Sequence, residues 1–328
     1  MNGFLGIDVG SVSTNLVVLD ESGAVKDSFY LRTQGQPIKA IKTCLNMAVE
    51  KFPGLKVLSV GTTGSARHLA SVIVGADTVK NEITAHAVAA SSMVPGVRTV
   101  IEIGGQDSKL IILRNGVVTD FAMNTVCAAG TGSFLDQQAA RLGIPIEQFG
   151  EMARRATIAV RIAGRCAVFA ESDMIHKQQM GYSLEDIGAG LCEALVRNFL
   201  NNLGKGKEIL SPIVFQGGVA ANVGMRDAFA KALATEIIVP EYFGVMGAVG
   251  AAILAREYAA KNGRTMFRGF STLDVDFNSK SIECSGCPNQ CEVVAIQRGS
   301  QVLARWGDRC GKWSGLNGSL INEELAEA

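Results

Sequence analysis

One short pattern of residues occurs twice in this chain, and it constrains the fold more than any other feature. The first copy is Gly6-Ile-Asp-Val-Gly-Ser11, followed by the apolar run that begins at Leu16. The second copy is Ile103-Gly-Gly-Gln-Asp-Ser108, followed by the apolar run that begins at Leu110. Each copy predicts a strand, a turn of Gly, Asp and Ser residues, a hydrophobic strand, and a Gly-containing turn into a third strand. The chain is therefore expected to contain the same three-stranded unit twice.

The turn in each copy has the composition of a phosphate-binding loop. Small residues let backbone amides approach an anion closely, and an aspartate can hold a metal ion beside it. Two such hairpins that faced each other would clamp a polyphosphate. The alternative is a pair of ordinary β-hairpins, and the similarity of the two copies argues against it.

Hydrophobic runs typical of strands alternate along the chain with segments of helical periodicity, which predicts an α/β fold. The 328 residues exceed one average domain and suit two, with a small appendage. The expected strands are Phe4–Asp8, Asn15–Leu19, Val25–Leu31, Leu55–Gly61, Thr99–Ile103, Lys109–Leu113, Val117–Met123 and Ile213–Phe215. The expected helices are Pro37–Lys51, Glu82–Met93 and four that begin near Gly132, Cys166, Ser183 and Ala221.

A third glycine-rich element contains Gly217, Gly218 and Asn222 and connects a predicted strand to a predicted helix. Because glycine has no side chain, a nucleoside could lie directly against the backbone there. The alternative is that paired glycines serve only tight packing between strand and helix. Two common nucleotide motifs are missing. Gly204-Lys-Gly-Lys207 lacks the glycine spacing and the Ser or Thr of a Walker A loop, and no G-x-G-x-x-G follows a strand.

Two cysteines, Cys127 and Cys166, each open a segment that reads as a helix after a short irregular stretch. Unpaired amides and the helix dipole favour a thiolate at such a position and attract anions. An iron–sulfur cluster is such an anion, but a cubane normally needs four thiolates. One chain supplies two, and two chains related by a dyad would supply four. The alternative is that both thiols are buried small hydrophobes.

The composition excludes several function classes. The 31 Lys and Arg residues balance 31 Asp and Glu residues, so nothing indicates binding to nucleic acid or to an anionic membrane. The N-terminus has no secretory signal, and the most apolar helix candidate, Val245 to Leu254, is too short to span a bilayer. We expect a soluble cytoplasmic protein whose eight cysteines are reduced thiols or metal ligands, not disulfides.

Together these segments resemble one branch of the actin-like ATPase superfamily: the activators of 2-hydroxyacyl-CoA dehydratases and the related benzoyl-CoA reductase ATPase subunits. The similarity runs from about residue 3 to 258, and the two cysteine segments are its most specific part. The residues that carry it are Gly6–Thr14, Asn81–His86, Glu102–Lys109, Asn124–Gly132, Arg165–Met174 and Gln216–Asn222.

The resemblance implies a duplicated actin-like (ribonuclease H-like) α/β fold, with two domains around a nucleotide cleft. Residues 1–94 with 246–262 would form the first subdomain, and residues 95–245 the second, which carries the cluster cysteines. Residues 263–328 would form a cysteine-containing C-terminal appendage.

The resemblance also implies an ATPase coupled to electron transfer. The protein would be a homodimer with one 4Fe-4S cluster in its interface, held by Cys127 and Cys166 of both chains. ATP hydrolysis would reorient the helices that leave the cluster, and an electron would pass to a partner. That partner would be a 2-hydroxyacyl-CoA dehydratase, a benzoyl-CoA-type reductase or a double-cubane cluster protein, and the donor a ferredoxin or flavodoxin.

Site roles follow from the same resemblance. Asp8 and Asp107 would position Mg²⁺, and Gln106 would orient the attacking water. The backbone and hydroxyls of the two turns would hold the phosphates of ATP, and the third glycine-rich element would border the nucleoside. The cofactor-binding residues are then Gly10, Ser11, Val12, Ser13, Thr14, Gly104, Gly105, Gly217, Gly218 and Asn222.

Some remaining residues have simpler interpretations. Glu82 and His86 lie four apart on one helix face, which predicts a hydrogen-bonded structural pair in the interdomain hinge. His176 is expected at the surface, and Cys44 and Cys192 are expected to pack in the core.

The C-terminal segment carries a second group of cysteines. Cys284, Cys287 and Cys291 have C-x-x-C-x-x-x-C spacing, and Cys310 lies between two tryptophans. Four such cysteines indicate a metal site, either a zinc knuckle or a second iron–sulfur cluster, with unligated thiols as the alternative.

For the chain as a whole, a sugar or carboxylate kinase on the same fold, or a chaperone-like nucleotide switch, would explain the hairpins. Neither would give Cys127 and Cys166 a role.

Overall fold

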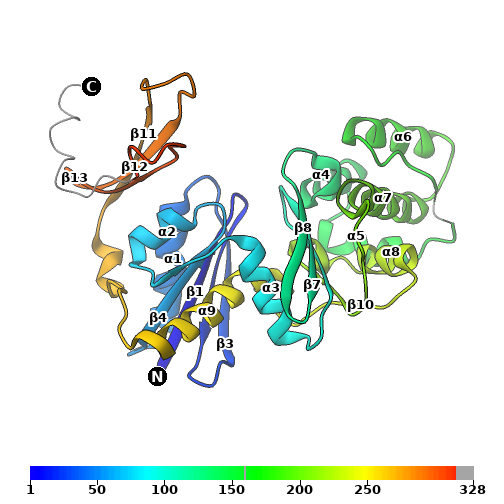
Figure 1. Ribbon diagram of the computed structural model, residues 1–328. Helices are drawn as coiled ribbons and strands as arrows, with labels where there is room; N and C mark the ends of the chain where they lie inside the picture. Colours follow the sequence, from blue (N-terminus) through cyan, green and yellow to red (C-terminus); the bar gives the residue numbers. More distant parts are fainter. Residues whose placement is uncertain (159, 315–328) are drawn as a thin grey trace. The chain divides into compact units, whose positions relative to one another are not determined.

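The computed structural model describes residues 1–158 and 160–314, and the chain forms two compact units (Figure 1). The first unit contains Met1–Asn81 and the chain from Ala251 onwards, and the second contains Glu82–Gly250. These boundaries differ from those of the predicted subdomains in three ways. Residues 246–250, which were expected in the first subdomain, group with the second unit. The helix Glu82–Met93 groups with the second unit, and the segment after residue 262 groups with the first unit.

The first unit is built on a five-stranded sheet. Its strands and the two helices packed on it are β1 (Asn2–Val9), β2 (Ser13–Leu19), β3 (Val25–Arg32), β4 (Lys56–Thr63), β5 (Thr78–Val79), α1 (Pro37–Lys51) and α2 (Arg67–Val74). Alternate residues of β1, such as Leu5 and Ile7, are fully buried in one apolar cluster with Ile41 of α1 and Ile73 of α2. Side chains two residues apart point to the same face of a sheet, so Leu5 and Ile7 lie on the face that packs against these helices.

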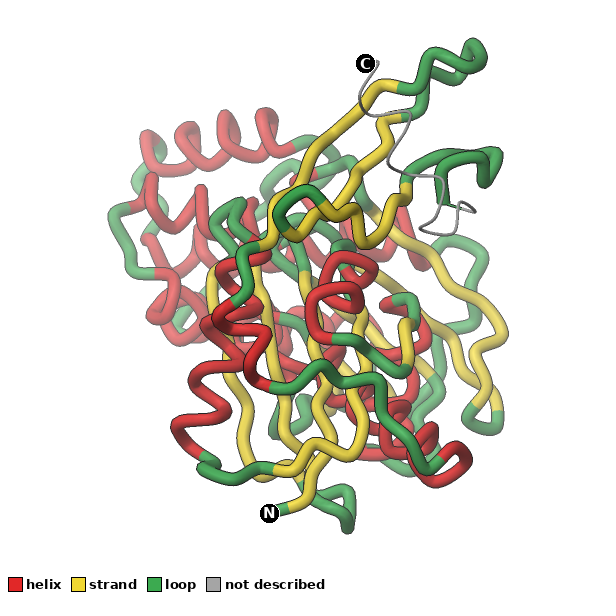
Figure 2. Tube along the Cα trace, turned by 90° about the vertical axis from the view of Figure 1, so that its left-hand side faces the viewer, coloured by secondary structure: helices red, strands yellow, loops and turns green. Residues whose placement is uncertain are grey.

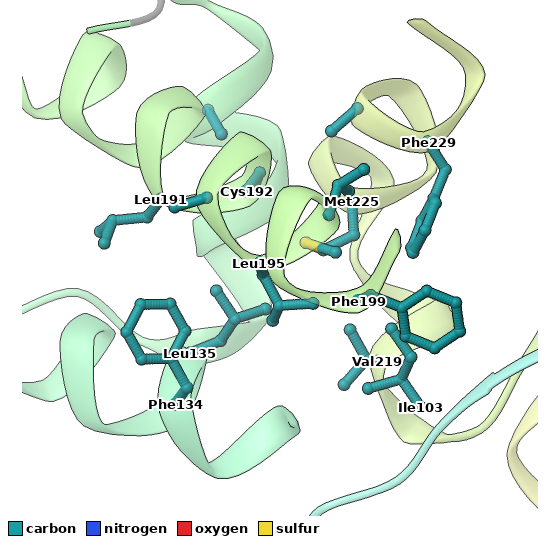
Figure 3. Packing of buried hydrophobic residues seen from close by; sticks show 14 of the residues in the cluster. Ile103, Phe134, Leu135, Leu191, Cys192, Leu195, Phe199, Val219, Met225 and Phe229 are labelled. Carbon is teal, nitrogen blue, oxygen red and sulfur yellow. The ribbon is translucent and has the colours of Figure 1, made fainter. Parts of the chain in front are cut away.

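The second unit has a sheet of the same design. Its elements are α3 (Glu82–Met93), β6 (Thr99–Ile103), β7 (Ser108–Arg114), β8 (Val117–Asn124), α4 (Gly132–Leu142), α5 (Ile146–Arg154), α6 (Ala167–Gln179), α7 (Leu184–Phe199), β9 (Ile213–Gln216), α8 (Val223–Leu233) and β10 (Ile237–Ile238). Figure 3 shows its core, in which Phe134 and Leu135 of α4 pack with Leu195 of α7 and Phe229 of α8.

The two sheets confirm the repeat. Their strand orders are β3-β2-β1-β4-β5 and β8-β7-β6-β9-β10. In each sheet the first three strands form antiparallel hairpins, and the last two run parallel to the central strand. The predicted α/β fold with a duplicated core is therefore correct.

The last long helix, α9 (Met246–Asn262), is longer than the sequence suggested. Together with the preceding turn, α9 forms the helical segment Phe243–Asn262. By length and composition alone, this is the one helical segment of the described residues that could cross a membrane. Half of its most apolar window is buried inside the protein. A Cβ on Gly250 would lie 1.9 Å from the carbonyl oxygen of Ala85, and the carbonyl oxygen of Ala251 would lie 2.1 Å from a Cβ on Gly61. Such close backbone packing is that of a core helix.

A small antiparallel sheet follows α9, in the segment that was expected to form a cysteine-containing C-terminal appendage. Its strands are β11 (Phe277–Glu283), β12 (Glu292–Arg298) and β13 (Gln301–Trp306) (Figure 2). Phe277 and Ile296 from one face of this sheet join the apolar cluster that contains α1 and α2. The segment is therefore attached to the first unit by buried apolar contacts.

Candidate functional site

The first predicted phosphate loop connects β1 to β2. Asp8 lies near the end of β1, and the turn is closed by a hydrogen bond of 2.9 Å from the amide of Gly10 to the carbonyl of Ser13. Ser11 is exposed and Ser13 partly exposed, so their hydroxyls can face a ligand. Thr14 differs, because its fully buried hydroxyl lies 3.0 Å from that of Thr33.

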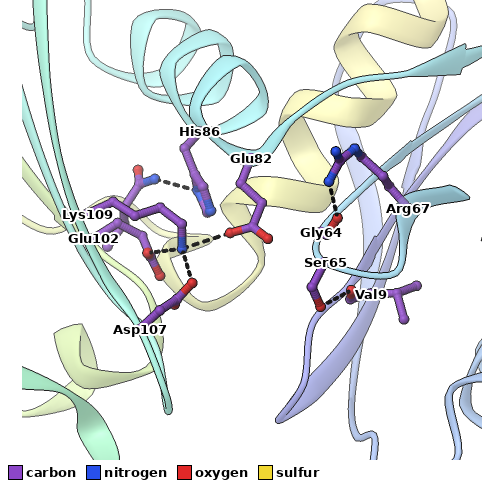
Figure 4. Close-up of polar contacts among 10 residues, drawn as sticks. Val9, Gly64, Ser65, Arg67, Glu82, His86, Glu102, Asp107 and Lys109 are labelled. Atoms are coloured by element: carbon purple, nitrogen blue, oxygen red, sulfur yellow. Dashed lines mark hydrogen bonds and ion pairs between the residues drawn. The ribbon is translucent and has the colours of Figure 1, made fainter. Parts of the chain in front are cut away.

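A loop that the sequence analysis did not identify lies beside Asp8. It follows β4, and Gly64 there has a φ of +93°. A Cβ on Gly64 would lie 2.6 Å from Oδ1 of Asp8, so only glycine allows this close approach to the carboxylate. The hydroxyl of Ser65 donates to the carbonyl of Val9 (Figure 4). The amide of Ala66 donates to the same carbonyl. The sequence signal was a Gly-Ser pair directly after a strand.

The second loop has the same closing bond. The amide of Gly104 donates to the carbonyl of Asp107 at 3.0 Å, which matches the bond from Gly10 to Ser13. Gly105 is partly exposed and Gln106 is exposed on this turn.

The hairpin register shows which residues of the two turns correspond. In β1 and β2 Asp8 pairs with Asn15, and in β6 and β7 Glu102 pairs with Lys109. Glu102, and not Asp107, is therefore the structural counterpart of Asp8. Asp107 corresponds to Ser13 in the first turn.

A buried cluster of charges surrounds Lys109, which is only 2 % exposed. Its Nζ lies 2.8 Å from an oxygen of Glu82, 2.9 Å from one of Glu102 and 2.8 Å from one of Asp107 (Figure 4). Lys109 and Glu102 had no role predicted from the sequence. Their own ion pair lies within one hairpin, and only the contact with Glu82 joins α3 to it. We call Lys109, Glu82, Glu102 and Asp107 the Lys109 cluster.

Charge counting determines the protonation of this cluster. Burial would lower the pKa of Lys109, but the three carboxylates outweigh burial and raise it above its ordinary value. One ammonium cannot balance three carboxylates, so a carboxyl that is both buried and close to the others holds its proton most strongly. Burial raises the pKa of Glu102 from 4.5 to about 7, although Lys109 opposes the shift. Glu102 therefore titrates near neutral pH.

Glu82 and His86 both lie on α3 but contact different partners, which corrects the predicted pair. Glu82 binds Lys109, whereas Nδ1 of His86 lies 2.7 Å from Nε2 of Gln216 at the end of β9. Burial lowers the pKa of His86 to about 3, and the charge of Lys109 adds to this shift. His86 is therefore neutral and accepts a hydrogen bond from the Gln216 amide.

The raised pKa of Glu102 predicts a pH-dependent effect of Glu102→Gln. The native state binds the proton of the Glu102 carboxyl more tightly than the unfolded state does. The free energy of unfolding that this proton contributes is complete below pH 4.5 and is lost as pH rises through about 7. Glutamine at this position stays neutral, so the variant does not lose this stability as pH rises. Between pH 5 and pH 8 we expect the variant to gain about 2–3 kcal/mol relative to wild type, measured by urea unfolding. A difference independent of pH would contradict the assignment.

The third glycine-rich element packs directly on the second hairpin. Gly217 has a φ of +88°, and a Cβ there would lie 2.4 Å from the carbonyl of Ile103 and 2.7 Å from Oε1 of Glu102. Open space surrounds the Cβ position of Gly218. The side-chain oxygen of Asn222 caps α8, whereas its buried Nδ2 has no hydrogen-bond partner within the described chain.

Cys127 and Cys166 both lie where a helical segment begins, as predicted. Cys166 is the N-cap of α6, and Cys127 precedes a 3-10 turn, η1 (Ala128–Gly130), which leads into α4. Both thiols are partly exposed. The Sγ of Cys127 lies 3.9 Å from the carbonyl oxygen of Arg165, so the two cysteine loops are adjacent in one chain.

Two asparagines hold these loops in place, and the sequence analysis did not select them. The side chain of Asn124 accepts from the amide of Cys127 at 2.9 Å and donates to its carbonyl at 2.8 Å. The side chain of Asn198 on α7 donates to the carbonyl of Gly164 at 2.6 Å. A helix-borne side chain thus supports the loop before Cys166, which positions its thiol without contacting it.

The other predicted cysteines fall into two groups. Cys44 and Cys192 are buried, as expected, and burial raises the pKa of each thiol to about 12. The four C-terminal cysteines occupy the loops at one end of the β11–β13 sheet. Within residues 1–158 and 160–314, no three His, Cys, Asp or Glu side chains are gathered closely enough to hold a metal ion. His176 is exposed on α6, as predicted.

A cavity of about 280 Å³ lies elsewhere in the second unit, among α5, α7 and α8. Its lining includes Cys192, Thr157 and the ion pairs Arg154–Asp227 and Lys231–Glu193. None of the residues predicted to bind nucleotide or metal lines it. We therefore assign no function to this cavity.

The comparisons with known proteins agree with this geometry. Residues 5–255 match the model of the BadF/BadG/BcrA/BcrD ATPase family. The chain is 37% identical over 260 residues to the (R)-2-hydroxyglutaryl-CoA dehydratase activating ATPase of Acidaminococcus fermentans, covering 78% of this chain and 98% of that protein. It is 33% identical over 271 residues to the 2-hydroxyisocaproyl-CoA dehydratase activator of Clostridioides difficile, covering 79% of this chain and 96% of that protein.

Solved structures of the same kind of protein are similar in fold. Component A of the Acidaminococcus fermentans (R)-2-hydroxyglutaryl-CoA dehydratase has a TM-score of 0.73 at 34% identity, covering 80% of this chain and 100% of that chain. The activator of the 2-hydroxyisocaproyl-CoA dehydratase from Clostridium difficile, solved with bound ADPNP, has a TM-score of 0.72 at 31% identity, covering 80% and 97%. This chain therefore belongs to the BadF/BadG/BcrA/BcrD ATPase family.

Proposed function

We propose that this ATPase is an activator that uses ATP to send a low-potential electron from a shared 4Fe-4S cluster to a partner metalloenzyme. The observation that carries the proposal is the pairing of Cys127 and Cys166 in adjacent loops, each at the start of a helical segment. Two partly exposed thiols per chain fit half of a cubane's ligand set. Each helix N-terminus adds a partial positive charge that suits an anionic cluster.

Exposed apolar side chains beside the thiols support a homodimer. Val126 is 94% exposed next to Cys127, and Val168 and Phe169, just after Cys166, are 68% and 67% exposed. Apolar surface at such a place is typical of an interface. We propose that Cys127 and Cys166 of two chains meet across a dyad and hold one cluster. The cluster, when bound, supplies the one-electron chemistry.

ATP and Mg²⁺ would be held by the two closed turns. Backbone amides around Gly10 and Gly104 would contact phosphate oxygens, with Ser11 and Ser13 as hydroxyl donors. Asp8 would position Mg²⁺ through water, and Asp107 would do so from the second turn while its other oxygen binds Lys109. Gln106, exposed on that turn, would orient the attacking water. Such hydrolysis needs positioning and charge neutralisation only.

We also propose the working context. Relatives named as activators of 2-hydroxyglutaryl-CoA, 2-hydroxyisocaproyl-CoA and lactoyl-CoA dehydratases, and one named as part of a benzoyl-CoA reductase, support a dehydratase or reductase as the partner. A double-cubane protein is the third candidate. The donor would be ferredoxin or flavodoxin, in the cytoplasm, with no role for nucleic acid or a membrane.

The proposed function is tested by an anaerobic activation assay. The purified chain is mixed with cluster-loaded 2-hydroxyglutaryl-CoA dehydratase, 2-hydroxyglutaryl-CoA, Mg-ATP and reduced ferredoxin. We expect dehydration that requires both ATP and the reductant, and none when ATP is replaced by ADPNP. Because the partner is inferred from relatives, the same assay is repeated with benzoyl-CoA reductase. Activation of neither enzyme, together with ATP-dependent phosphorylation of a sugar or carboxylate, would show a kinase instead.

A further inference from the structure

The C-terminal sheet needs an explanation of its own. The family model ends at residue 255, and the first dehydratase activator is matched over 98% of its length by 78% of this chain. The β11–β13 sheet therefore lies outside the region that the ATPase family accounts for.

Four cysteines lie at one end of this sheet. Cys284, Cys287 and Cys291 occupy the loop between β11 and β12, and the amide of Cys284 donates to the carbonyl of Cys291 at 2.8 Å. Cys310 lies in the segment after β13. That segment adjoins the same loop, because Nε1 of Trp313 lies 3.2 Å from Sγ of Cys284.

A hydrogen-bond donor lies beside the thiol of Cys284. The Cys284 side chain is buried, and Nε1 of Trp313 lies 3.2 Å from its sulfur. Donors directed at a sulfur are what a metal-bound thiolate needs around it.

Arg305 is the independent observation that points to an anionic ligand. Its side chain is 7% exposed, and its guanidinium carbon lies 4.8 Å from the centre of the Trp313 ring. Its Nε and Nη2 atoms are buried and have no hydrogen-bond partner among the residues that the structure describes. A buried guanidinium without a partner is costly unless a negative charge lies nearby.

We propose that Cys284, Cys287, Cys291 and Cys310 bind a metal as four thiolates, and that Arg305 offsets the negative charge of this centre. Zinc with four thiolates and a 4Fe-4S cluster with four thiolates carry the same charge of about −2 when the cluster is oxidised. The thiols release their protons to solvent on binding. Since no three of them converge in the structure, the β11–β12 loop closes on the metal, which couples binding to local folding.

This proposal does not depend on the bridging cluster, and the test keeps the two apart. The full chain carrying Cys127→Ser and Cys166→Ser is purified without oxygen, and zinc, iron and sulfide are measured. We expect one zinc ion per chain without sulfide, or four irons with sulfide and visible absorption; the two results distinguish the metals. Cys284→Ser and Cys287→Ser should each abolish binding, whereas Cys44→Ala, the control, should leave it unchanged. Absence of both metals, also after reconstitution with Zn²⁺ or with Fe²⁺ and sulfide, would overturn the proposal.

The role of Arg305 has its own test. Arg305→Met is compared with Arg309→Met, an exposed arginine four residues away on the same segment. By competition with a chromophoric chelator, we expect Arg305→Met to weaken metal binding about 10–100-fold and Arg309→Met to leave it near wild type. Tryptophan fluorescence reports the change directly, since Trp313 contacts Cys284. Equal affinities in both variants would contradict the charge-offsetting role.

Discussion

Replacing Cys166 by alanine is expected to remove all iron from the bridging site and to leave a folded protein that still binds ATP. Each variant chain withdraws one thiolate, so a dimer loses two of the four ligands that a cubane needs. The thiol is partly exposed and caps α6 without a side-chain hydrogen bond. Its loss should therefore change stability by less than about 1 kcal/mol. ATP-driven electron transfer should fall to background.

The measurement uses a chain whose four C-terminal cysteines are serine, so that only the bridging site can hold iron. Iron and sulfide are determined without oxygen, and ATP binding is followed by calorimetry. The control is Cys192→Ala, which removes a fully buried thiol of the same unit and should keep its iron. A Cys166→Ala protein with the wild-type iron content would rule out the assigned ligand.

The second large effect is expected from Lys109→Met, which should destabilise the protein by about 3–5 kcal/mol. The substitution leaves Glu82, Glu102 and Asp107 close together without their shared ammonium. Glu102 is almost completely buried, so water cannot replace the lost partner. Because Asp107 belongs to the second predicted phosphate turn, ATP hydrolysis should also be lost. Urea unfolding and a steady-state ATPase assay measure the two effects.

Two comparisons make this prediction specific. Lys51→Met removes an ion pair whose lysine is 58% exposed, and should cost at most about 1 kcal/mol. The double variant Lys109→Met with Glu82→Gln should be more stable than Lys109→Met alone, because one of the carboxylates left without the ammonium is gone. If Lys109→Met and Lys51→Met cost the same, the Lys109 cluster does not stabilise the fold.

Much of the fold could be predicted because its elements have strong local signals. The bounds of α1, α3 and β6 agree with the structure, and Ser183 caps α7 as expected, with its hydroxyl accepting from the amide of Asp186. The short helices α2 and α5 were not predicted. A segment of eight or nine residues shows only about two turns of helical periodicity, which is a weak signal. Such short helices are stabilised by buried apolar residues, such as Phe149, once the chain has packed.

The positions of candidate site residues could be predicted where the signal lies within one short segment. They could not be predicted where a residue's place depends on strand register or on contacts with another element. Cys127 and Cys166 were found from their position before helical segments. The correspondence between Asp8 and Glu102 depends on strand register, which residue types along the sequence do not reveal. Asn198 and Arg305 gave no sequence signal, since the groups that they contact, the carbonyl of Gly164 and the ring of Trp313, lie on other segments.

The most direct test of the account is native mass spectrometry of the anaerobic chain with its four C-terminal cysteines replaced by serine. We predict a dimer whose mass exceeds that of two chains by one 4Fe-4S cluster, and which loses that excess mass in Cys127→Ala and Cys166→Ala. A monomer that carries a complete cluster by itself, or a dimer without iron that still activates the partner enzyme, would contradict the claim that two chains share one cluster.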